Sequence, residues 1–425
     1  MTRYPVRYLI LGLASCIVLA GLTAWISNSY YAAIAQSSRP DTSTPAMAQP
    51  AINPQLVTAD NQFGFQLFSQ LVQQDPAQNL MISPTSVAIA LSMLYNGAQG
   101  ETQQQIANTL ELQGLSLEDL NHANAALKTV LEQADPSVKL AIANSLWGNQ
   151  QITFKPDFMA RMRSFYTAEV KTLDFNDPAA VNTINRWVEH HTEGKIPTIL
   201  DQINPNEAMF LINAVYFKGQ WQQKFDTAQT SDRPFTLLDG STRNHPLMSQ
   251  SGNYLYQEND RFQAVSLPYG DGRLSMDVFL PKPGVSLTQF YPELLSTRHW
   301  NTAMTHFTRR DGTIQLPRFQ YEYTVRLNDA LKSLGMPLAF DPDAADLKGL
   351  TEQASHVSEV RHKTFIEVNE TGTEAAAVTS IAVQTTSLQL PTEPFTMTVD
   401  RPFFYTIRDH KTGAILFMGC LVNPQ

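Results

Sequence analysis

Two adjacent histidines, His190 and His191, are side chains of this 425-residue chain that could bind a metal ion. Neighbouring residues do not share a helix face, so the pair predicts a solvated helix end ahead of Gly194 rather than a metal site. The sequence also lacks a nucleophile elbow, a Gly-rich phosphate loop, a zinc-protease His-Glu pattern and a cysteine pair with metal-ligand spacing. No enzyme, metal site or cofactor is therefore predicted.

An acidic stretch further along resembles a calcium loop only in part. Asp341, Asp343 and Glu352 stand at the first, third and twelfth positions of such a loop. Ala345 and Asp346 occupy the positions that need a ligand and a glycine. The stretch is therefore interpreted as a polar turn.

Only two cysteines, Cys16 and Cys420, are present. Cys420 lies in the apolar run AILFMGCLV, which predicts a small buried side chain rather than a nucleophile. Cys16 lies in a segment that export would remove, so the mature chain would hold one thiol and no disulfide. Its stability must then come from its core.

The segment 368–394, VNETGTEAAAVTSIAVQTTSLQLPTEP, has no large apolar face to bury. Read as a strand, residues 373–385 alternate between two faces, and the face that begins with Thr373 carries no charge. These residues include no proline, glycine or aromatic side chain. Such a segment could slide between two strands of a sheet that part to admit it.

Composition predicts a sizeable folded core. The chain is 43% hydrophobic and 10% aromatic, which suits one large domain or two ordinary ones. The formal charge is −9, and Arg3 and Arg7 are the only charges before Gln36, so removal of residues 1–35 leaves 28 basic and 39 acidic side chains. This acidic balance argues against nucleic acid and anionic membrane surfaces as partners.

Residues 1–35 have the pattern of a signal peptide. Arg3 and Arg7 precede an apolar run, and Ala33-Ile34-Ala35 has the small-x-small form that signal peptidase accepts. Cleavage near Ala35 would give a secreted protein or one of the cell envelope, periplasmic or extracellular.

Two other fates of this segment stay open. The apolar run from Tyr8 to Ile26 is long enough for an uncleaved membrane anchor. Leu13-Ala14-Ser15-Cys16 has the form of a lipoprotein box, although the apolar run continues well past Cys16. Residues 36–54 are rich in Pro, Ser, Thr and Ala, and they predict a flexible linker.

Residues 55–425 show no repeat and no second low-complexity linker, which indicates one large α+β domain. Ser83 as N-cap and Pro84 at the first position predict a helix that ends near Asn96. The apolar run AMFLINAVYFKG predicts a strand buried on both faces. Further strand candidates are RLSMDVFLP, GTIQLPRFQYEYTV, KTFIEVNE, PFFYTIRD and AILFMGCLV.

Six stretches together resemble the serpin superfamily of serine protease inhibitors, and they follow one another in serpin order. They are NLMISPTSVAIALSMLYNGAQGET, ANSLWGNQQITFKPDF, NRWVEHHTEGKIPTIL, LINAVYFKGQWQQKFD, HKTFIEVNETGTEAAAVTS and DRPFFYTIRDHKTGAILFMGCLVNP. The resemblance extends from about Leu56 to Pro424. It implies an α+β serpin fold with three β-sheets, about nine helices and an exposed reactive-centre loop, which is the uncommitted segment above.

The resemblance also implies a mechanism of inhibition. A serine protease attacks the loop and forms an acyl-enzyme, and the cut loop then inserts into the central sheet and drags the protease before water resolves the ester. The inhibitor is thus a suicide substrate. The residues that match the family's inhibitory hinge are Glu370, Gly372, Thr373, Glu374, Ala375, Ala376, Ala377 and Thr379.

Two further groups of residues are implied by the same resemblance. A polar "shutter" beneath the central sheet would consist of Ser83, Ser86, Asn213 and His362. A "breach", where insertion starts, would consist of Trp221, Arg318 and Glu370.

The reactive bond is located by counting along the loop. Roughly seventeen residues from Glu370, as inhibitory serpins need, place the bond between Thr386 and Ser387, where Thr suits an elastase-like pocket. A bond between Leu388 and Gln389, for a chymotrypsin-like protease, is the alternative. No Lys or Arg lies in this part of the loop, so a trypsin-like target is disfavoured.

The expected partners are serine proteases, with cysteine proteases as a second class, and the expected state is a monomer. A heparin-type cofactor is not expected, because LSLEDLNHANAALKTVLEQ offers only Lys128 where such serpins place a basic helix. The sequon Asn369-Glu370-Thr371 lies at the hinge, where a glycan would obstruct insertion, and this favours a bacterial envelope or medium. The alternative function is a non-inhibitory, exported binding protein or chaperone with the serpin fold.

Overall fold

The computed structural model of the chain describes residues 51–373 and 393–424, and within these ranges it confirms an α+β fold with nine α-helices. The first helix of the described residues begins at Pro54, one residue before the domain start predicted from the sequence. The helices are α2 (Pro54–Gln74), α3 (Pro84–Tyr95), α4 (Gly100–Thr109), α5 (Leu117–Glu132), α6 (Pro156–Arg161), α7 (Ala179–His191), α8 (Leu287–Phe290), α9 (Thr297–Thr305) and α10 (Asn328–Ser333).

Helix α3 begins where the sequence predicts, with Pro84 at its first position and Asn96 as C-cap. Ser83 stands at the N-cap position, but its side chain makes no capping hydrogen bond. Its backbone N–H instead donates to the His362 imidazole, because this residue lies against the central sheet. Helix α5 does have a side-chain cap, since the Ser116 hydroxyl accepts a hydrogen bond from the Asp119 N–H.

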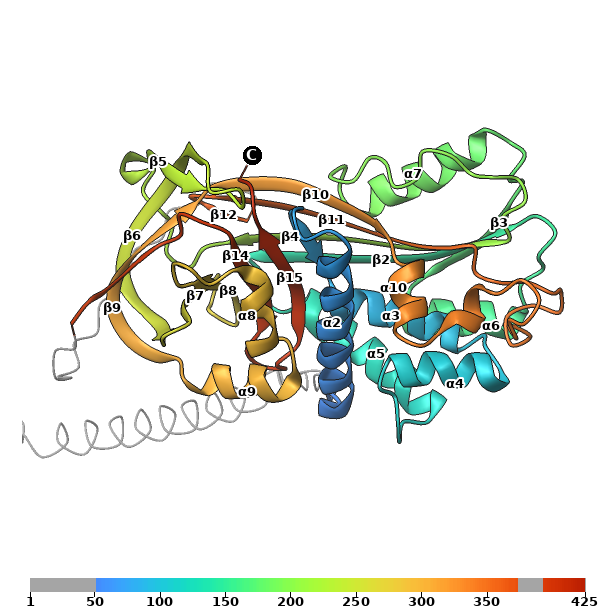
Figure 1. The fold of residues 1–425 in the computed structure, drawn as a ribbon. Coiled ribbons are helices and arrows are strands. Elements are labelled where there is room, and N and C mark those ends of the chain that lie inside the picture. The colour runs from blue at the N-terminus through green and yellow to red at the C-terminus, as the bar shows by residue number, and fades with distance from the viewer. Residues whose placement is uncertain (1–50, 374–392, 425) are drawn as a thin grey trace, which may run out of the picture. The chain divides into compact units, whose positions relative to one another are not determined.

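The central sheet has six strands in the order β10-β11-β12-β4-β2-β3. Strand β4 is buried along nearly its whole length, which confirms the prediction for AMFLINAVYFKG. Helices cover both faces of this sheet (Figure 1), which is why β4 has no solvated face. Its strands are β2 (Val138–Asn149), β3 (Glu169–Leu173), β4 (Met209–Gln220), β10 (Phe319–Arg326), β11 (Glu359–Asn369) and β12 (Gly372–Thr373).

The second sheet has nine strands, with the path β1-β15-β14-β8-β7-β6-β9-β13 and β5 beside β6. Strand β6 is long enough to pair with β5 near its start and with β7 near its end, so it joins two parts of one sheet. These two parts and the central sheet account for the three sheets that the serpin resemblance implies. The strands are β1 (Leu80–Ile82), β5 (Ser231–Thr236), β6 (Thr242–Glu258), β7 (Phe262–Tyr269), β8 (Leu274–Pro281), β9 (Thr308–Pro317), β13 (Phe395–Thr398), β14 (Phe403–Asp409) and β15 (Ile415–Leu421).

The candidate strand GTIQLPRFQYEYTV is divided by the structure into β9 and β10, which belong to different sheets. The division falls at Arg318, whose backbone N–H donates to the Pro246 carbonyl. Arg318 is therefore the joint between the two sheets.

Helix α7 lies on one face of the central sheet, and α2 and α3 lie on the other (Figure 1). Ile184 and Val188 of α7 belong to a buried cluster with Phe210 and Ile212 of β4 and Phe365 of β11. Helix α7 and the chain after it therefore cover the line along which β4 and β11 meet.

The minor predictions agree with the structure. Helix α7 ends at His191, and the Asp341 carboxylate accepts hydrogen bonds from the Asp343 and Ala344 N–H groups, as in a polar turn. Cys420 is a buried free cysteine. Among the described residues, no helix has the length and apolar character needed to cross a bilayer.

Candidate functional site

The hinge begins inside the central sheet. Gly372 and Thr373 form β12, which is antiparallel to both β11 and β4 and lies between them. Further along, Glu359–Phe365 of β11 pairs directly and in parallel with Phe210–Tyr216 of β4. The sheet is thus closed along most of the line between β4 and β11, and two hinge residues separate the strands at one end.

Gly372 is required by the closeness of the neighbouring strand. Its φ is +149°, and a Cβ at this position would lie 2.0 Å from the Gly219 carbonyl oxygen. Any larger residue would have to move the hinge or β4. The glycine in the hinge sequence therefore has a direct steric explanation.

Thr373 is completely buried, and its hydroxyl lies 2.7 Å from the Tyr269 hydroxyl. The Tyr269 ring stacks on the Trp221 indole with 4.4 Å between centroids and 9° between planes. Burial raises the pKa of Tyr269 well above its usual value, so the hydroxyl stays neutral and can both donate and accept. Tyr269, the last residue of β7 in the second sheet, thus binds the hinge.

Trp221 holds the chain immediately before β12. Its indole Nε1–H donates to the Asn369 carbonyl at 2.9 Å, and its backbone N–H donates to the Thr371 carbonyl at 3.0 Å. The Phe225 N–H donates to the Glu370 carbonyl at 2.9 Å. Three consecutive carbonyl groups, those of residues 369–371, are therefore bound at the start of the hinge by one short segment after β4.

Glu370 is the charged centre of the breach. It is 4% exposed, and its carboxylate accepts hydrogen bonds from Arg318 Nε at 2.7 and 2.9 Å and from the Thr230 hydroxyl at 2.5 Å. Burial by itself raises the pKa of Glu370, but the hydrogen bonds from Arg318 and Thr230 lower it below its usual value. The structure thus brings together the predicted breach residues Trp221, Arg318 and Glu370.

The shutter residues meet where three strands lie side by side. His362 Nδ1 is 2.5 Å from Asn213 Oδ1, and Asn213 Nδ2 donates to Ser86 Oγ at 2.6 Å. The Ser83 N–H donates to His362 Nε2 at 3.2 Å, which fixes the neutral tautomer with the proton on Nδ1. Burial lowers the pKa of His362 to about 3 despite the hydrogen bond to Asn213.

Asn144 adjoins the predicted shutter residues, although the sequence did not predict it there. Asn213 Nδ2 donates to its side-chain oxygen at 2.5 Å, and the two asparagines face each other across β2 and β4. Its only sequence signal is an amide in the mostly apolar strand AIANSLWG. With Asn144 the buried polar row extends over β2, β4 and β11.

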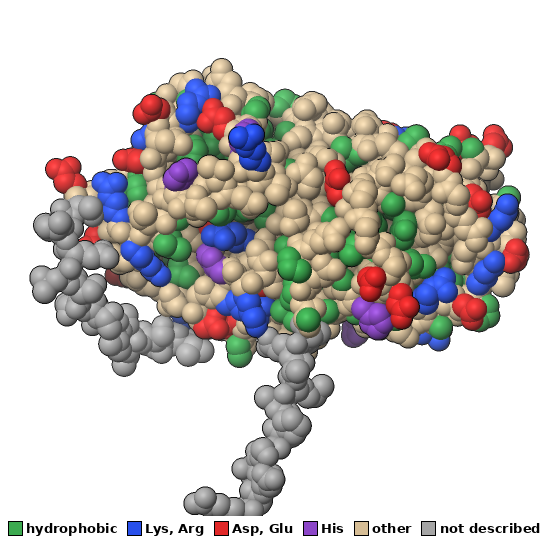
Figure 2. All heavy atoms as spheres, turned by 90° about the horizontal axis from the view of Figure 1, so that it is seen from below, with side chains coloured by type: hydrophobic (Ala, Val, Ile, Leu, Met, Phe, Trp, Pro, Cys, Tyr) green, Lys and Arg blue, Asp and Glu red, His purple; other side chains and the backbone are tan. Residues whose placement is uncertain are grey.

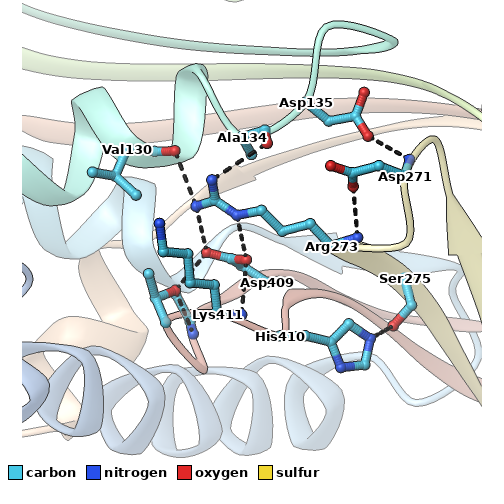
Figure 3. Close-up of polar contacts among 11 residues, drawn as sticks. Val130, Ala134, Asp135, Asp271, Arg273, Ser275, Asp409, His410 and Lys411 are labelled. Atoms are coloured by element: carbon cyan, nitrogen blue, oxygen red, sulfur yellow. Dashed lines mark hydrogen bonds and ion pairs between the residues drawn. The ribbon is translucent and has the colours of Figure 1, made fainter. Parts of the chain in front are cut away.

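The turn after Tyr269 is held by hydrogen bonds to the end of α5 and the residues that follow it (Figure 3). The Asp271 N–H donates to the Asp135 carboxylate at 2.6 Å. Arg273 makes two hydrogen bonds of 2.9 Å to the fully buried Asp409 and also donates to the Val130 carbonyl, at the end of α5. The residues that hold the hinge are therefore connected to α5 through one turn.

The remaining predicted site residues lie outside the described ranges. They are Glu374, Ala375, Ala376, Ala377 and Thr379 of the hinge, and Thr386, Ser387, Leu388 and Gln389 around the two candidate reactive bonds. Their roles stay predictions from the sequence.

Comparison with known proteins identifies the family. The family model described as serpin (serine protease inhibitor) matches residues 58–424. The chain belongs to the serpin family. Human leukocyte elastase inhibitor is 33% identical over 382 residues, which cover 87% of this chain and 100% of that protein.

Solved serpin structures have the same fold. The native state of tengpin, a thermophilic serpin, has a TM-score of 0.80 and 32% identity, covering 88% of this chain and 96% of that one. Human thyroxine-binding globulin has a TM-score of 0.79 and 27% identity, covering 87% and 98%. The serpin resemblance and the α+β serpin fold expected from the sequence are thereby confirmed.

Proposed function

We propose that this serpin is a suicide-substrate inhibitor of serine proteases. The observation that carries the proposal is β12: the first two inserting residues already lie between β4 and β11. The chain that follows them in sequence is small and uncharged on alternate positions. Insertion of about a dozen further residues, at about 1 kcal/mol for each new hydrogen bond, would release on the order of 10 kcal/mol. That free energy drives the arrest of the acyl-enzyme.

The proposed target is an elastase-like protease, with a chymotrypsin-like protease as the alternative. Thr386 before Ser387 offers a small side chain to the protease, and Leu388 before Gln389 offers a larger one. Relatives named as leukocyte elastase inhibitors support the first choice. Cysteine proteases form a second class of target.

The test is incubation of the purified chain with pancreatic elastase, followed by denaturing gel electrophoresis. We expect a covalent band at the summed mass of protease and inhibitor. Elastase whose catalytic serine has been blocked is the control and should give no such band. Cleavage of the chain without any band would favour the alternative function.

The alternative is a non-inhibitory, exported binding protein or chaperone. The observation in its favour is the similarity to thyroxine-binding globulin, whose name describes a carrier. A carrier would leave the protease active in the same experiment, so one gel and one activity assay separate the two functions.

The protein is proposed to act outside the cytoplasm, as a monomer and without a heparin-type cofactor. Basic and acidic side chains are interspersed on the face that carries α4, α5 and α9, and no continuous basic area is visible there (Figure 2). The export proposal rests on residues 1–35 and the cleavage site near Ala35. Cell fractionation tests it, since an uncleaved chain found only in the cytoplasm would contradict it.

A further inference from the structure

Two lysines stand side by side on the central sheet, next to the hinge. Lys139 of β2 and Lys218 of β4 are registered directly opposite one another. Both point to the face on which α7 lies, because Ala143 and Tyr216, at alternate positions of the same strands, belong to the buried cluster that contains residues of α7. Like charges in directly opposite positions destabilise a sheet, so this pair calls for compensating anions.

Only one of these two positive charges is compensated. Lys139 forms an ion pair with Glu193, in the turn after α7. The other ammonium group, that of Lys218, is half-buried, and no carboxylate of the described residues forms an ion pair with it. Lys218 is therefore a cation without an anion in a chain whose formal charge is −9.

The register of β12 shows which residue would reach Lys218. Thr373 pairs with Gly219 of β4, and the two strands are antiparallel, so the next residue of an inserting strand stands opposite Lys218. The Thr373 side chain points to Tyr269 in the second sheet, so the next side chain points to the other face, where Lys218 lies. That next residue in sequence is Glu374.

The neighbour on the other side of this position is an acid. Thr373 also pairs with Val368 of β11, so an inserted Glu374 would stand opposite Glu367, on the same face. The Glu367 carboxylate accepts a hydrogen bond from Asn369 Nδ2 at 3.1 Å, which leaves its negative charge in place. The entering carboxylate would thus lie between one lysine and one glutamate, and without the lysine it would meet only repulsion.

We propose that Lys218 is a positioning residue for loop insertion, and that it pairs with the Glu374 carboxylate as the strand begins to enter. This inference deepens the proposed function and rests on it. Glu374 is the only charged residue from 373 to 385, so no other side chain in that range can form the ion pair. Entry of Glu374 compensates the free lysine and offsets the repulsion from Glu367.

The ion pair would act at the first step of insertion. Glu374 is the first residue to enter after β12, so its pairing lowers the free energy of the state in which β4 and β11 begin to part. Hydrolysis of the acyl-enzyme competes with insertion, so slower entry releases more cleaved inhibitor for each complex formed. The ratio of cleaved free inhibitor to covalent complex therefore measures the effect. Salt screens a partly exposed ion pair, so the effect should shrink in concentrated sodium chloride.

The test compares charge variants of the full chain with elastase on a denaturing gel. We expect Lys218→Gln to raise the ratio of cleaved inhibitor to complex about threefold, the effect of losing one partly exposed cross-strand ion pair. Lys218→Glu should raise the ratio further, and the exchange Lys218→Glu with Glu374→Lys should return it to the unmodified value. Lys171→Gln is the matched control, because Lys171 is a lysine of the edge strand β3, away from the hinge, and it should leave the ratio unchanged.

Two results would overturn the proposal. One is an equal ratio for Lys218→Gln and the unmodified chain. The other is a charge exchange that leaves the ratio as high as Lys218→Glu alone, because the loss would then come from packing and not from charge. Melting curves of the uncleaved variants check that they are folded, and if Lys218→Glu is not, Lys218→Gln decides.

A second measurement separates this inference from the proposed function. Cleavage of the loop should raise the melting temperature less in Lys218→Gln than in the unmodified chain, and this rise does not require a trapped protease. If the unmodified chain forms no covalent complex, the proposed function fails, while the melting temperatures still decide whether Lys218 pairs with the inserted strand. If complexes form and the rise is equal in both chains, the proposed function stands and the role of Lys218 is overturned.

Discussion

The Tyr269 hydroxyl binds the Thr373 hydroxyl in a site without solvent. Tyr269→Phe removes this hydrogen bond and leaves the Thr373 hydroxyl without that partner, at an expected cost of about 1 kcal/mol. We expect faster amide hydrogen exchange at residues 371–373, measured by mass spectrometry. The matched control is Tyr166→Phe, which removes another buried hydroxyl, bonded to Asn121 of α5 at 2.6 Å and belonging neither to the central sheet nor to the segment 221–225. Equal protection in both variants would show that Tyr269 does not hold the hinge.

His362 should make stability depend on pH. Its folded pKa of about 3 lies below the ordinary value of 6.5, so between these values the unfolded chain binds more protons than the folded one. The free energy of unfolding therefore has its full value above about pH 6.5. It decreases as the pH falls below that value, by at most about 1.4 kcal/mol per pH unit. Urea unfolding between pH 7 and 5 measures the slope. The slope should be smaller in His362→Gln, and identical slopes would contradict the assignment.

Single residues could be predicted only where the serpin resemblance marks them. Ser86, Asn213 and His362 were predicted in this way, and the structure places them in one hydrogen-bonded group. Tyr269 and Asn144 were missed because their partners are distant in sequence, 104 residues away for Tyr269 and 69 for Asn144. Neither local periodicity nor turn chemistry identifies such partners.

The hinge is the element on which inhibition depends. Ala375→Pro removes an N–H that insertion needs and fixes φ, so insertion should stall two residues after Thr373. We expect the variant to be cleaved by elastase as a substrate, with little covalent complex on a denaturing gel. Ala375→Ser keeps the N–H and should retain the complex. A full yield of complex from the proline variant would mean that the hinge is assigned wrongly.

The turn between β7 and β8 connects the hinge support to α5, and Arg273 is its anchor. Arg273→Met leaves the fully buried Asp409 carboxylate without its ion-pair partner, at an expected cost of about 3 kcal/mol. Urea denaturation measures the loss. The double variant Arg273→Met with Asp409→Asn should recover part of it, because no uncompensated charge remains. A double variant as unstable as the single one would point to packing rather than charge.

Elements were predicted well where periodicity was strong and poorly where a strand changes sheet. The nearly continuous apolar run in β4 predicts the burial that the strand shows. In contrast, GTIQLPRFQYEYTV continues its alternation through Arg318, and no local feature of the sequence marks a break. The division into β9 and β10 depends on pairing with β6 and β11, which no local pattern encodes.

The whole molecule should be metastable if the loop is an unused strand. Quantitative cleavage within residues 380–390 should raise the melting temperature sharply, because insertion adds a strand to the central sheet. Differential scanning calorimetry before and after cleavage measures the change. A chain cleaved elsewhere, in the linker 36–54, is the control and should melt as before. An unchanged melting curve after cleavage in the loop would count against insertion.

At this scale the family and fold class could be predicted from the sequence, and the joining of two parts of one sheet by β6 could not. The resemblance gives the order of the elements. The length of continuous pairing along β6 is a property of the folded backbone, and it emerges only when Thr242 and Glu258 are seen with their partners.

The position of β12 makes insertion similar to branch migration in DNA. Insertion separates the seven registered pairs between β4 and β11, and each residue that enters makes two new pairs, one with each strand. The fork between the strands already exists at Gly372 and Thr373, so no new opening has to nucleate. The progress of the fork should then be fastest where the seam is apolar and slowest at Asn213 and His362, whose mutual hydrogen bond must break before the strand can pass.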